Sequence, residues 1–102
     1  MVLATCPINI SEDLASKIVG KRLVACVNVV KKVKSFYWWQ GNLENEMEAI
    51  LLMKTRADLF HQLQEFFLSI HPYDNPEIIA LPIIKGSSQY LEWVKLETTR
   101  EE

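Results

Sequence analysis

The sequence is poor in the residues on which several common kinds of site depend. Its 102 residues include only three glycines, Gly20, Gly41 and Gly86, so there is no glycine-rich loop of the kind that surrounds a phosphate group. It has two cysteines, Cys6 and Cys26, and no C-x-x-C pair, which argues against a disulfide framework and favours a reducing compartment. The sequence therefore predicts neither a nucleotide-binding loop nor a disulfide-rich secreted fold.

Long apolar runs and an excess of basic residues are also missing. No run approaches the roughly 18 apolar residues of a membrane-spanning helix, and the N-terminus lacks the charged and apolar regions of a signal peptide. The net charge is −2, so the chain carries no basic field for binding nucleic acid. We therefore expect a cytoplasmic protein that has neither a membrane nor a nucleic acid as its partner.

Hydrophobic residues are plentiful by contrast. They make up 49% of the chain, which argues against disorder. The length fits one domain, which we expect to span residues 1–102. Because a domain of this size has a large surface for its volume, so high an apolar content favours association of the chain with copies of itself.

The first half of the chain predicts a strand, a helix and a long hairpin. The apolar run Val2–Cys6 reads as a strand, and the helical spacing that follows it has Asn9 or Ser11 as its cap. Residues 25–39 and 43–55 read as two strands around a turn at residues 40–42. The predicted hairpin is long enough to extend beyond the rest of the fold.

The odd-numbered residues of the first hairpin strand are predicted to share one face, because side chains alternate along a strand. They are Val27, Val29, Val33, Tyr37 and Trp39. A turn centred on Gly41 would place Trp39 opposite Leu43 and Lys34 opposite Glu48. The second of these pairs would give an attractive contact between opposite charges across the hairpin. Such pairing would explain two charge clusters, which are Lys31, Lys32 and Lys34 on one strand and Glu44, Glu46 and Glu48 on the other.

The second half of the chain predicts a helix, a strand and a final helix. Thr55–Asp58 resembles a capping box, and helical spacing follows it until the pair His71-Pro72. Residues 77–83 are apolar at both parities, as in a strand that is covered on both faces. Gly86–Ser88 then predicts a turn and a helix cap.

This order, β-α-β-β-α-β with an added C-terminal helix, is that of an α+β ferredoxin-like sandwich. Both helices of that fold lie on one face of an antiparallel sheet. The other face would be apolar here, since Ile50, Leu52 and the run at residues 78–83 belong to the strands. We therefore expect partner subunits to cover that face.

Chemically active side chains are densest between His71 and Glu77. Pro72 and Pro76 make this connection stiff, because each fixes its own backbone and restricts the residue before it. The His71 imidazole, with Asp74 close in sequence, could bind a divalent cation. The alternative is a structural histidine at a helix end that bonds to backbone carbonyls. Cys6 is a second candidate metal ligand, whereas Cys26 is expected to be buried and inert.

Four segments of this sequence together resemble the CutA family, which is linked to divalent-cation tolerance. They are Cys26-Val27-Asn28, Tyr37-Trp38-Trp39-Gln40-Gly41, His71-Pro72-Tyr73 through Pro76-Glu77-Ile78-Ile79-Ala80-Leu81-Pro82, and Tyr90-Leu91-Glu92-Trp93. The resemblance covers almost the whole chain. It implies a ferredoxin-like subunit in a homotrimer that is similar to the P-II signalling proteins, with no established catalytic activity.

The resemblance also implies a link to copper, since bacterial members of the family bind divalent copper. Some of them carry a copper-linked cysteine two residues before the position of Cys6, where this chain has Ala4. The same members have two adjacent histidines where this chain has Ile70 and His71. Only His71 is therefore carried over, and we expect His71, Cys6 and Asp74 to be the metal-binding residues.

A second set of residues is expected to line clefts between subunits. It comprises Tyr37, Lys54, Glu77, Tyr90 and Trp93. Lys54 near Glu77 suggests either an anion-binding or acid-base cleft or a structural ion pair at a subunit boundary.

The aromatic residues Trp38 and Trp39 lie near the hairpin tip. They could stack on bases, but large aromatic side chains at a hairpin tip more often anchor an interface. We therefore assign Trp38 and Trp39 to the trimer interface.

The leading functional hypothesis is a trimeric, non-catalytic protein that binds copper(II) or another divalent cation, directly or through a small ligand, without an organic cofactor. A P-II-like module that binds a small regulatory ligand is the alternative, as is a structural assembly protein. An enzyme that uses His71, Tyr73 and Glu77 as acid-base groups is a further hypothesis, although no nucleophile motif accompanies them.

Overall fold

The structure is a computed structural model that describes residues 1–99. Its sheet has the strand order β2-β3-β1-β4, and all three pairings are antiparallel. The elements in chain order are β1 (Val2–Cys6), the 3-10 turn η1 (Ile8–Ile10), α1 (Ser11–Gly20), β2 (Cys26–Trp39), β3 (Asn42–Lys54), the 3-10 turn η2 (Ala57–Leu59), α2 (Phe60–Ile70), β4 (Ile78–Ala80) and α3 (Ser88–Glu97). The predicted ferredoxin-like order with an added C-terminal helix is confirmed.

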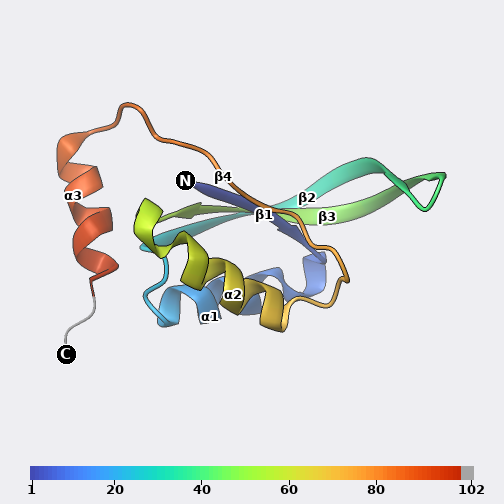
Figure 1. The fold of residues 1–102 in the computed structure, drawn as a ribbon, viewed down its shortest axis with the longest axis horizontal. Coiled ribbons are helices and arrows are strands. Elements are labelled where there is room, and N and C mark those ends of the chain that lie inside the picture. The colour runs from blue at the N-terminus through green and yellow to red at the C-terminus, as the bar shows by residue number, and fades with distance from the viewer. Residues whose placement is uncertain (100–102) are drawn as a thin grey trace.

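The two central helices, α1 and α2, lie on the same face of the sheet, while the β2–β3 hairpin extends well beyond them (Figure 1). Alternate residues of the strands point toward these helices, as the period of two requires. The buried core between the layers consists of Val2, Ala4, Cys6, Leu14, Ile18, Leu23, Val24, Ala49, Leu51, Met53, Leu63 and Phe67. These residues bury the apolar stripe of each helix against one side of β1 and β3.

Helix caps are only partly as the sequence predicts. Ser87 caps α3 as expected, since its hydroxyl accepts a hydrogen bond from the Tyr90 N–H at 3.4 Å. Neither Asn9 nor Ser11 caps α1: Ser11 is its first residue, and the Ser11 hydroxyl donates to the Ile8 carbonyl at 2.8 Å. The 3-10 turn before α1 provides this closer partner.

The capping box predicted at Thr55 is also wrong. The Thr55 hydroxyl donates to the Leu23 carbonyl at 2.6 Å, so it joins two distant parts of the chain instead of starting a helix. The helical segment begins with the 3-10 turn at Ala57, and α2 follows it from Phe60. A tertiary partner has therefore replaced the local one.

A bulge interrupts β2 where it leaves the body of the fold. Val30 pairs with Ile50 and Val33 pairs with Glu48, so Lys31 and Lys32 together lie opposite Ala49. An extra residue in one strand bends that strand and increases its twist. The bulge thus redirects the hairpin as it passes beyond α1 and α2.

The bulge also moves the odd-numbered residues of β2 from one face to the other. Before it, Val27 and Val29 pair with buried residues of β3, whereas Val33 and Tyr37 after it pair with glutamates on the opposite side of β3. The prediction of a single shared face up to Trp39 is therefore wrong, because one inserted residue reverses the alternation.

The hairpin turn consists of two residues, Gln40 and Gly41, with φ values of 49° and 83°. Two positive φ angles are typical of the type I′ turn, whose twist matches that of the flanking strands. Trp39 consequently pairs with Asn42 and not, as predicted, with Leu43. The turn lies where the sequence places it, but it is one residue shorter than expected.

The predicted pair of Lys34 and Glu48 is wrong for the same reason. Lys34 lies opposite Met47, and its ammonium group is 5.6 Å from the centre of the Phe36 ring. The side chain of Lys34 shares a face of the hairpin with that of its partner Met47. Glu48 is the next residue along β3, so its side chain lies on the opposite face.

The last strand is much shorter than predicted. β4 covers only Ile78–Ala80, all of which pairs with β1, and the chain from residue 81 to residue 87 then crosses to α3 as an extended, exposed segment (Figure 1). Ile84 in that segment is 86% exposed. The expectation of a strand over residues 77–83 that is covered on both faces does not hold for the single chain. Leu81 and Met1 exchange backbone hydrogen bonds of 2.7 and 2.9 Å, but residues 82–84 pair with no strand among the described residues.

The face of the sheet away from α1 and α2 is apolar around the middle of the sheet, and no helix within residues 1–99 covers it. Leu3, Ile50 and Leu52 belong to this face and are only partly buried, while Val30 and Ile79 are exposed. Within residues 1–99, no helix is long and apolar enough to cross a membrane. The exposed apolar surface formed by these strand residues is thus the uncovered second face of the sheet.

The conformation of the hairpin turn yields a prediction about stability. Gly41→Ala should lower the free energy of unfolding by about 1–2 kcal/mol, because an L-residue resists a positive φ. Gly20→Ala is the matched control: it lies in the last turn of α1, and a Cβ added there would have no atom within 4 Å, so it should leave stability unchanged or raise it by up to about 1 kcal/mol. Urea denaturation of both variants at one protein concentration measures the difference. Equal effects of the two substitutions would contradict the assignment of the turn.

Candidate functional site

His71 directly follows the last residue of α2 and is held in place by contacts with β1 and the loop after the helix. It precedes Pro72 and has the extended backbone that this position requires, with φ −85° and ψ 137°. Its Nε2 lies 2.9 Å from the Thr5 carbonyl oxygen of β1, and its Nδ1 accepts the Tyr73 backbone N–H at 3.1 Å. The ring packs against Phe67 and Tyr73 at centroid distances of 5.0 and 4.7 Å, and His71 is only 8% exposed.

These contacts fix the tautomer of His71. Since Nδ1 accepts a hydrogen bond, the proton lies on Nε2 and is donated to Thr5. An imidazole nitrogen binds a metal ion by donating the lone pair of the nitrogen. The only lone pair of this ring already accepts a hydrogen bond, so His71 would have to leave its present partners in order to ligate a metal.

The other two predicted metal ligands do not complete a site with His71. Cys6 is fully buried in the core, and its burial, reinforced by the nearby Glu48, raises the pKa of its thiol from 9.0 to about 11. Metal ligation requires the thiolate, which this environment disfavours. Asp74 is exposed in the loop after α2. Nowhere in residues 1–99 do three His, Cys, Asp or Glu side chains form a metal-binding group.

The donor set of one chain therefore does not fit a metal ion. Metal binding by His71, Cys6 and Asp74 stays a prediction that would need ligands from a second chain. The alternative interpretation of His71 agrees better with its contacts, although the carbonyl that it binds belongs to β1 and not to its own helix.

A groove of about 880 Å³ lies where the hairpin leaves the body of the fold. We call it the acidic groove. It is lined by Thr5, Ser35, Phe36, Tyr37, Trp38, Trp39, Glu44, Glu46, Glu48, Pro72, Tyr73, Asp74, Asn75 and Glu77. The wall of this groove therefore consists largely of carboxylates and aromatic rings, and no basic residue is among its lining residues.

Tyrosine hydroxyl groups face the carboxylates of the acidic groove. The Tyr73 hydroxyl donates to Glu46 Oε2 at 3.1 Å. Burial raises the pKa of the Tyr73 hydroxyl, and a hydrogen bond to Glu46 and the charges of nearby glutamates raise it further. The same causes raise the pKa of Tyr37. Glu48 is only 5% exposed. The groove therefore has a strongly negative potential that would attract a cation and disfavour an anion.

A second cluster lies at the opposite end of the sheet, where β2 begins and β3 ends. We call it the strand-end cluster, formed by Cys26, Asn28, Lys54, Tyr90 and Trp93. The Lys54 ammonium group donates to Asn28 Oδ1, and the Tyr90 and Trp93 rings lie 5.6 Å apart on α3. Burial and the neighbouring Cys26 raise the pKa of Tyr90.

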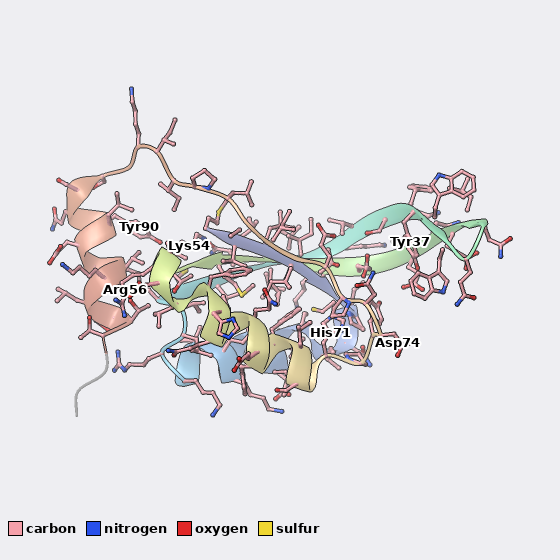
Figure 2. The ribbon with its side chains drawn as sticks, viewed as in Figure 1. Tyr37, Lys54, Arg56, His71, Asp74 and Tyr90 are labelled. Atoms are coloured by element: carbon pink, nitrogen blue, oxygen red, sulfur yellow. The ribbon has the colours of Figure 1, made fainter. Side chains whose placement is uncertain are left out.

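The residues predicted to line one cleft therefore divide into two groups within a chain. Tyr37 and Glu77 line the acidic groove, whereas Lys54, Tyr90 and Trp93 lie at the other end of the sheet. Figure 2 shows Lys54 and Tyr90 near α3, far from Tyr37, His71 and Asp74. The two groups could share a cleft only if different chains brought them together.

Several residues of the site were not singled out as ligand-binding residues from the sequence. Glu44, Glu46 and Glu48 were interpreted only as partners for lysines, although their alternation already placed them on one face of a strand. Tyr73 was considered only for acid-base catalysis, and Asn28 only as part of a family motif. Trp38 and Trp39 do lie on the hairpin, and Trp38 is 72% exposed.

Comparison with known proteins confirms the resemblance to the CutA family over almost the whole chain. The family described as "CutA1 divalent ion tolerance protein" matches residues 1–97. "Divalent-cation tolerance protein CutA" of Thermus thermophilus is 41% identical over 99 residues, which is 96% of each chain. A solved CutA1 structure from the same organism superposes with a TM-score of 0.92 over 96% of both chains.

Two further relatives show how widely the similarity extends. "Protein CutA 1, chloroplastic" of Oryza sativa is 47% identical over 88 residues, which is 86% of this chain and 49% of the relative. The solved "PII-like protein CutA" of Nostoc sp. has a TM-score of 0.91 and 31% identity, with 96% of this chain and 95% of that chain covered. The chain spans about half the length of the plant and animal relatives that it matches. Divalent ion tolerance is named in the family description and in the name of the Thermus thermophilus relative.

The buried thiol yields a prediction about alkaline stability. Unfolded Cys6 releases its proton near pH 9, whereas folded Cys6 keeps it until about pH 11. Its contribution to stability is therefore complete below pH 9 and is lost as the pH rises from 9 to 11. Between these pH values, the wild type should lose about 2 kcal/mol more unfolding free energy than Cys6→Ala does. Urea titrations at half-unit pH intervals measure the two slopes, and parallel slopes would contradict the prediction.

Proposed function

The chain belongs to the CutA1 family of divalent ion tolerance proteins, and on this basis we propose that it is a non-catalytic homotrimer with ligand clefts between subunits. The ligand is a divalent cation, either alone or carried by a small molecule. One observation above all supports the proposal: the predicted cleft residues lie at opposite ends of one chain, and the sheet between them has an open apolar face.

Exposed apolar groups support the assembly. Most of the large side chains at the hairpin tip are exposed, as are those of Ile79 in β4 and of the segment after β4. They include Phe36, Trp38, Trp39, Leu43, Met47, Ile79, Leu81, Ile83 and Ile84. β2 is also an edge strand of 14 residues, and an edge of that length exposes backbone groups that can pair with another chain. Trp38 and Trp39 would anchor the contact, since large aromatic residues are enriched in interfaces.

A ring of three chains would bring the two ends of the sheet together. In a cyclic trimer, each contact joins two different surfaces, so one end of a chain can meet the opposite end of the next. The carboxylates of the acidic groove would then approach Lys54, Tyr90 and Trp93 of a neighbouring chain. Such a cleft would combine a negative wall with one ammonium group and two aromatic rings, which suits a ligand with both charged and apolar parts.

A cation in this cleft would have the groove carboxylates as its most accessible donors. Asp74 and Glu77 are not buried, whereas Cys6 is fully buried and both nitrogens of His71 already have partners. Carboxylate oxygens favour Mg²⁺, Ca²⁺ or Mn²⁺, while copper(II) prefers nitrogen donors. Copper(II) binding at His71 therefore requires the ring to give up its present hydrogen bonds to Thr5 and Tyr73.

A P-II-like module that binds a small regulatory ligand is the second candidate. The Nostoc relative named "PII-like protein CutA" favours it, as does the strand-end cluster. Lys54 could neutralise an acidic group of a ligand that Tyr90 and Trp93 contact by stacking. A purely structural role would use the same assembly without a ligand. The cytoplasmic location stays a prediction, because similar proteins carry the descriptions chloroplastic and periplasmic.

Metal titration tests the proposed ligand. Purified protein titrated with copper(II), zinc(II) and manganese(II) in a calorimeter should bind at least one ion at micromolar concentration. Asp74→Asn should weaken that binding at least about tenfold, since it removes an exposed charge of the groove. His71→Ala should weaken copper(II) binding in particular if His71 is a ligand.

His61→Ala is the matched control for this titration. His61 is exposed on α2 and lies 2.7 Å from Glu65, so it could bind copper(II) adventitiously. Binding that disappears in His61→Ala but persists in Asp74→Asn and His71→Ala would overturn the direct-metal form of the proposal. Absence of binding heat for all three ions would do the same.

A further inference from the structure

The C-terminal helix α3 is attached to the rest of the chain mainly by its last turn. The segment before it, residues 81–87, is exposed throughout, and most of α3 is exposed as well. Its well-buried positions are Val94 and, just after the helix, Thr98, which is only 1% exposed. Within one chain, the residues around Thr98 are therefore the main point at which the rest of the fold holds α3.

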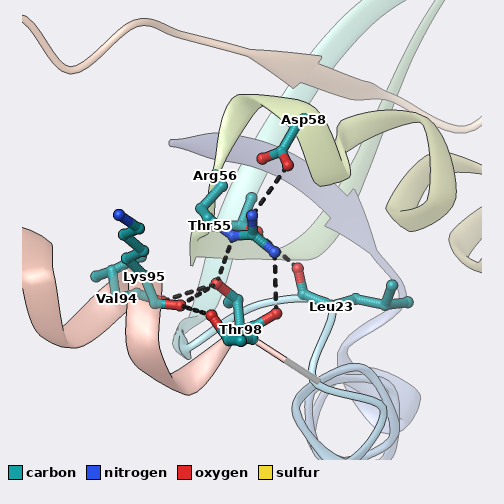
Figure 3. A network of polar contacts seen from close by, with 8 residues as sticks. Leu23, Thr55, Arg56, Asp58, Val94, Lys95 and Thr98 are labelled. Atoms are coloured by element: carbon teal, nitrogen blue, oxygen red, sulfur yellow. Dashed lines mark hydrogen bonds and ion pairs between the residues drawn. The ribbon is translucent and has the colours of Figure 1, made fainter. Parts of the chain in front are cut away.

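Arg56 binds this end of α3 with a fork of hydrogen bonds (Figure 3). Its Nε donates to Thr98 Oγ1 at 3.0 Å, and its Nη2 donates to the Thr98 carbonyl at 3.1 Å. Its remaining Nη1 lies 2.9 Å from Asp58 Oδ2. Thr98 in turn donates its hydroxyl to the Val94 carbonyl at 2.9 Å. A single guanidinium group thus connects the junction of β3 and η2 to the last turn of α3.

The charge and shape of Arg56 suit this position. The last carbonyls of a helix have no partner within the helix, and they carry the negative end of its dipole. A planar guanidinium satisfies two acceptors at fixed angles, which a lysine ammonium on a flexible stem does not do. Thr55 secures the base of the fork, because its hydroxyl binds the Leu23 carbonyl.

A second arginine touches the same turn in a different manner. Arg22 Nη1 lies 3.1 Å from both the carbonyl and the carboxylate Oε2 of Glu97. Both side chains are about half exposed, and an exposed ion pair of this kind contributes little to stability. Arg22 therefore provides a matched comparison for Arg56.

The position of α3 decides what covers the strand-end cluster. Tyr90, in the first turn of α3, lies beside Cys26 closely enough to affect its own pKa. The Trp93 ring adjoins that of Tyr90, and Figure 2 shows Tyr90 on the side of α3 toward the end of β3 that carries Lys54. If the last turn of α3 came loose, this cover would move away.

We propose that Arg56 is the positioning residue that latches α3 over the strand-end cluster, and that release of this latch uncovers Cys26 and Lys54. The latch belongs to each chain by itself, so it does not depend on the ligand proposed above. α3 then acts as a cover whose last turn is held by Arg56, while the core between the sheet and the helices α1 and α2 stays folded.

The two cysteines report separately on the cover and on the core. Cys26 is partly buried beside α3, whereas Cys6 is fully buried in the core. The full chain would be treated with N-ethylmaleimide under native conditions, and the alkylation rate of each cysteine followed by peptide mass spectrometry. Arg56→Lys should raise the rate at Cys26 at least about tenfold and leave the rate at Cys6 within about twofold. Arg22→Lys should change neither rate by more than about twofold.

Hydrogen exchange provides an independent measurement of the same variants. In Arg56→Lys, the amides of α3 should exchange at least about tenfold faster, while those of β1 and α1 keep the wild-type rates. Unchanged rates at Cys26 and in α3 would overturn the proposal. A parallel increase at both cysteines, or in α1 and α3 alike, would also overturn it, because Arg56 would then stabilise the whole fold and not the cover.

Discussion

The structure depends on one imbalance: its sheet has apolar residues on both faces, but the helices within residues 1–99 cover only one of them. α1 and α2 bury the inner side of β1 and β3, while Leu3, Ile50 and Leu52 belong to the open side. The hairpin adds further apolar surface beyond the helices (Figure 1). An apolar sheet face in water is unfavourable in proportion to its area. This open face supports the proposal that the chain is one part of an assembly.

This imbalance also explains why the candidate site is divided. The acidic groove lies at the base of the hairpin, and the strand-end cluster lies beneath α3, so each alone has only one kind of charge. Contacts between different surfaces of neighbouring chains would give each groove the charges that it lacks. The Arg56 latch adds a means of control, since it places Tyr90 and Trp93 where such a cleft would have its wall.

The sequence predicted features that local patterns determine. Element order, the place of the hairpin turn, the end of α2 at His71 and the Ser87 cap all follow from periodicity, proline and glycine. Features that depend on distant partners were not predictable in this way. Thr55 bonds to Leu23 instead of capping a helix, and His71 bonds to Thr5, 66 residues away. The bulge opposite Ala49 leaves no clear mark in the pattern, yet it reverses the faces of half a strand. The alternating glutamates did carry a usable signal for the groove.

The most direct test of this account is the mass of the protein in solution. Sedimentation velocity over a range from micromolar to nanomolar protein would measure it without a ligand or a variant. The account predicts one species with three times the 11.8 kDa mass of the chain across that range. A particle with the mass of a single chain that remains folded at every concentration would contradict it, because the open face of the sheet would then be stable in water.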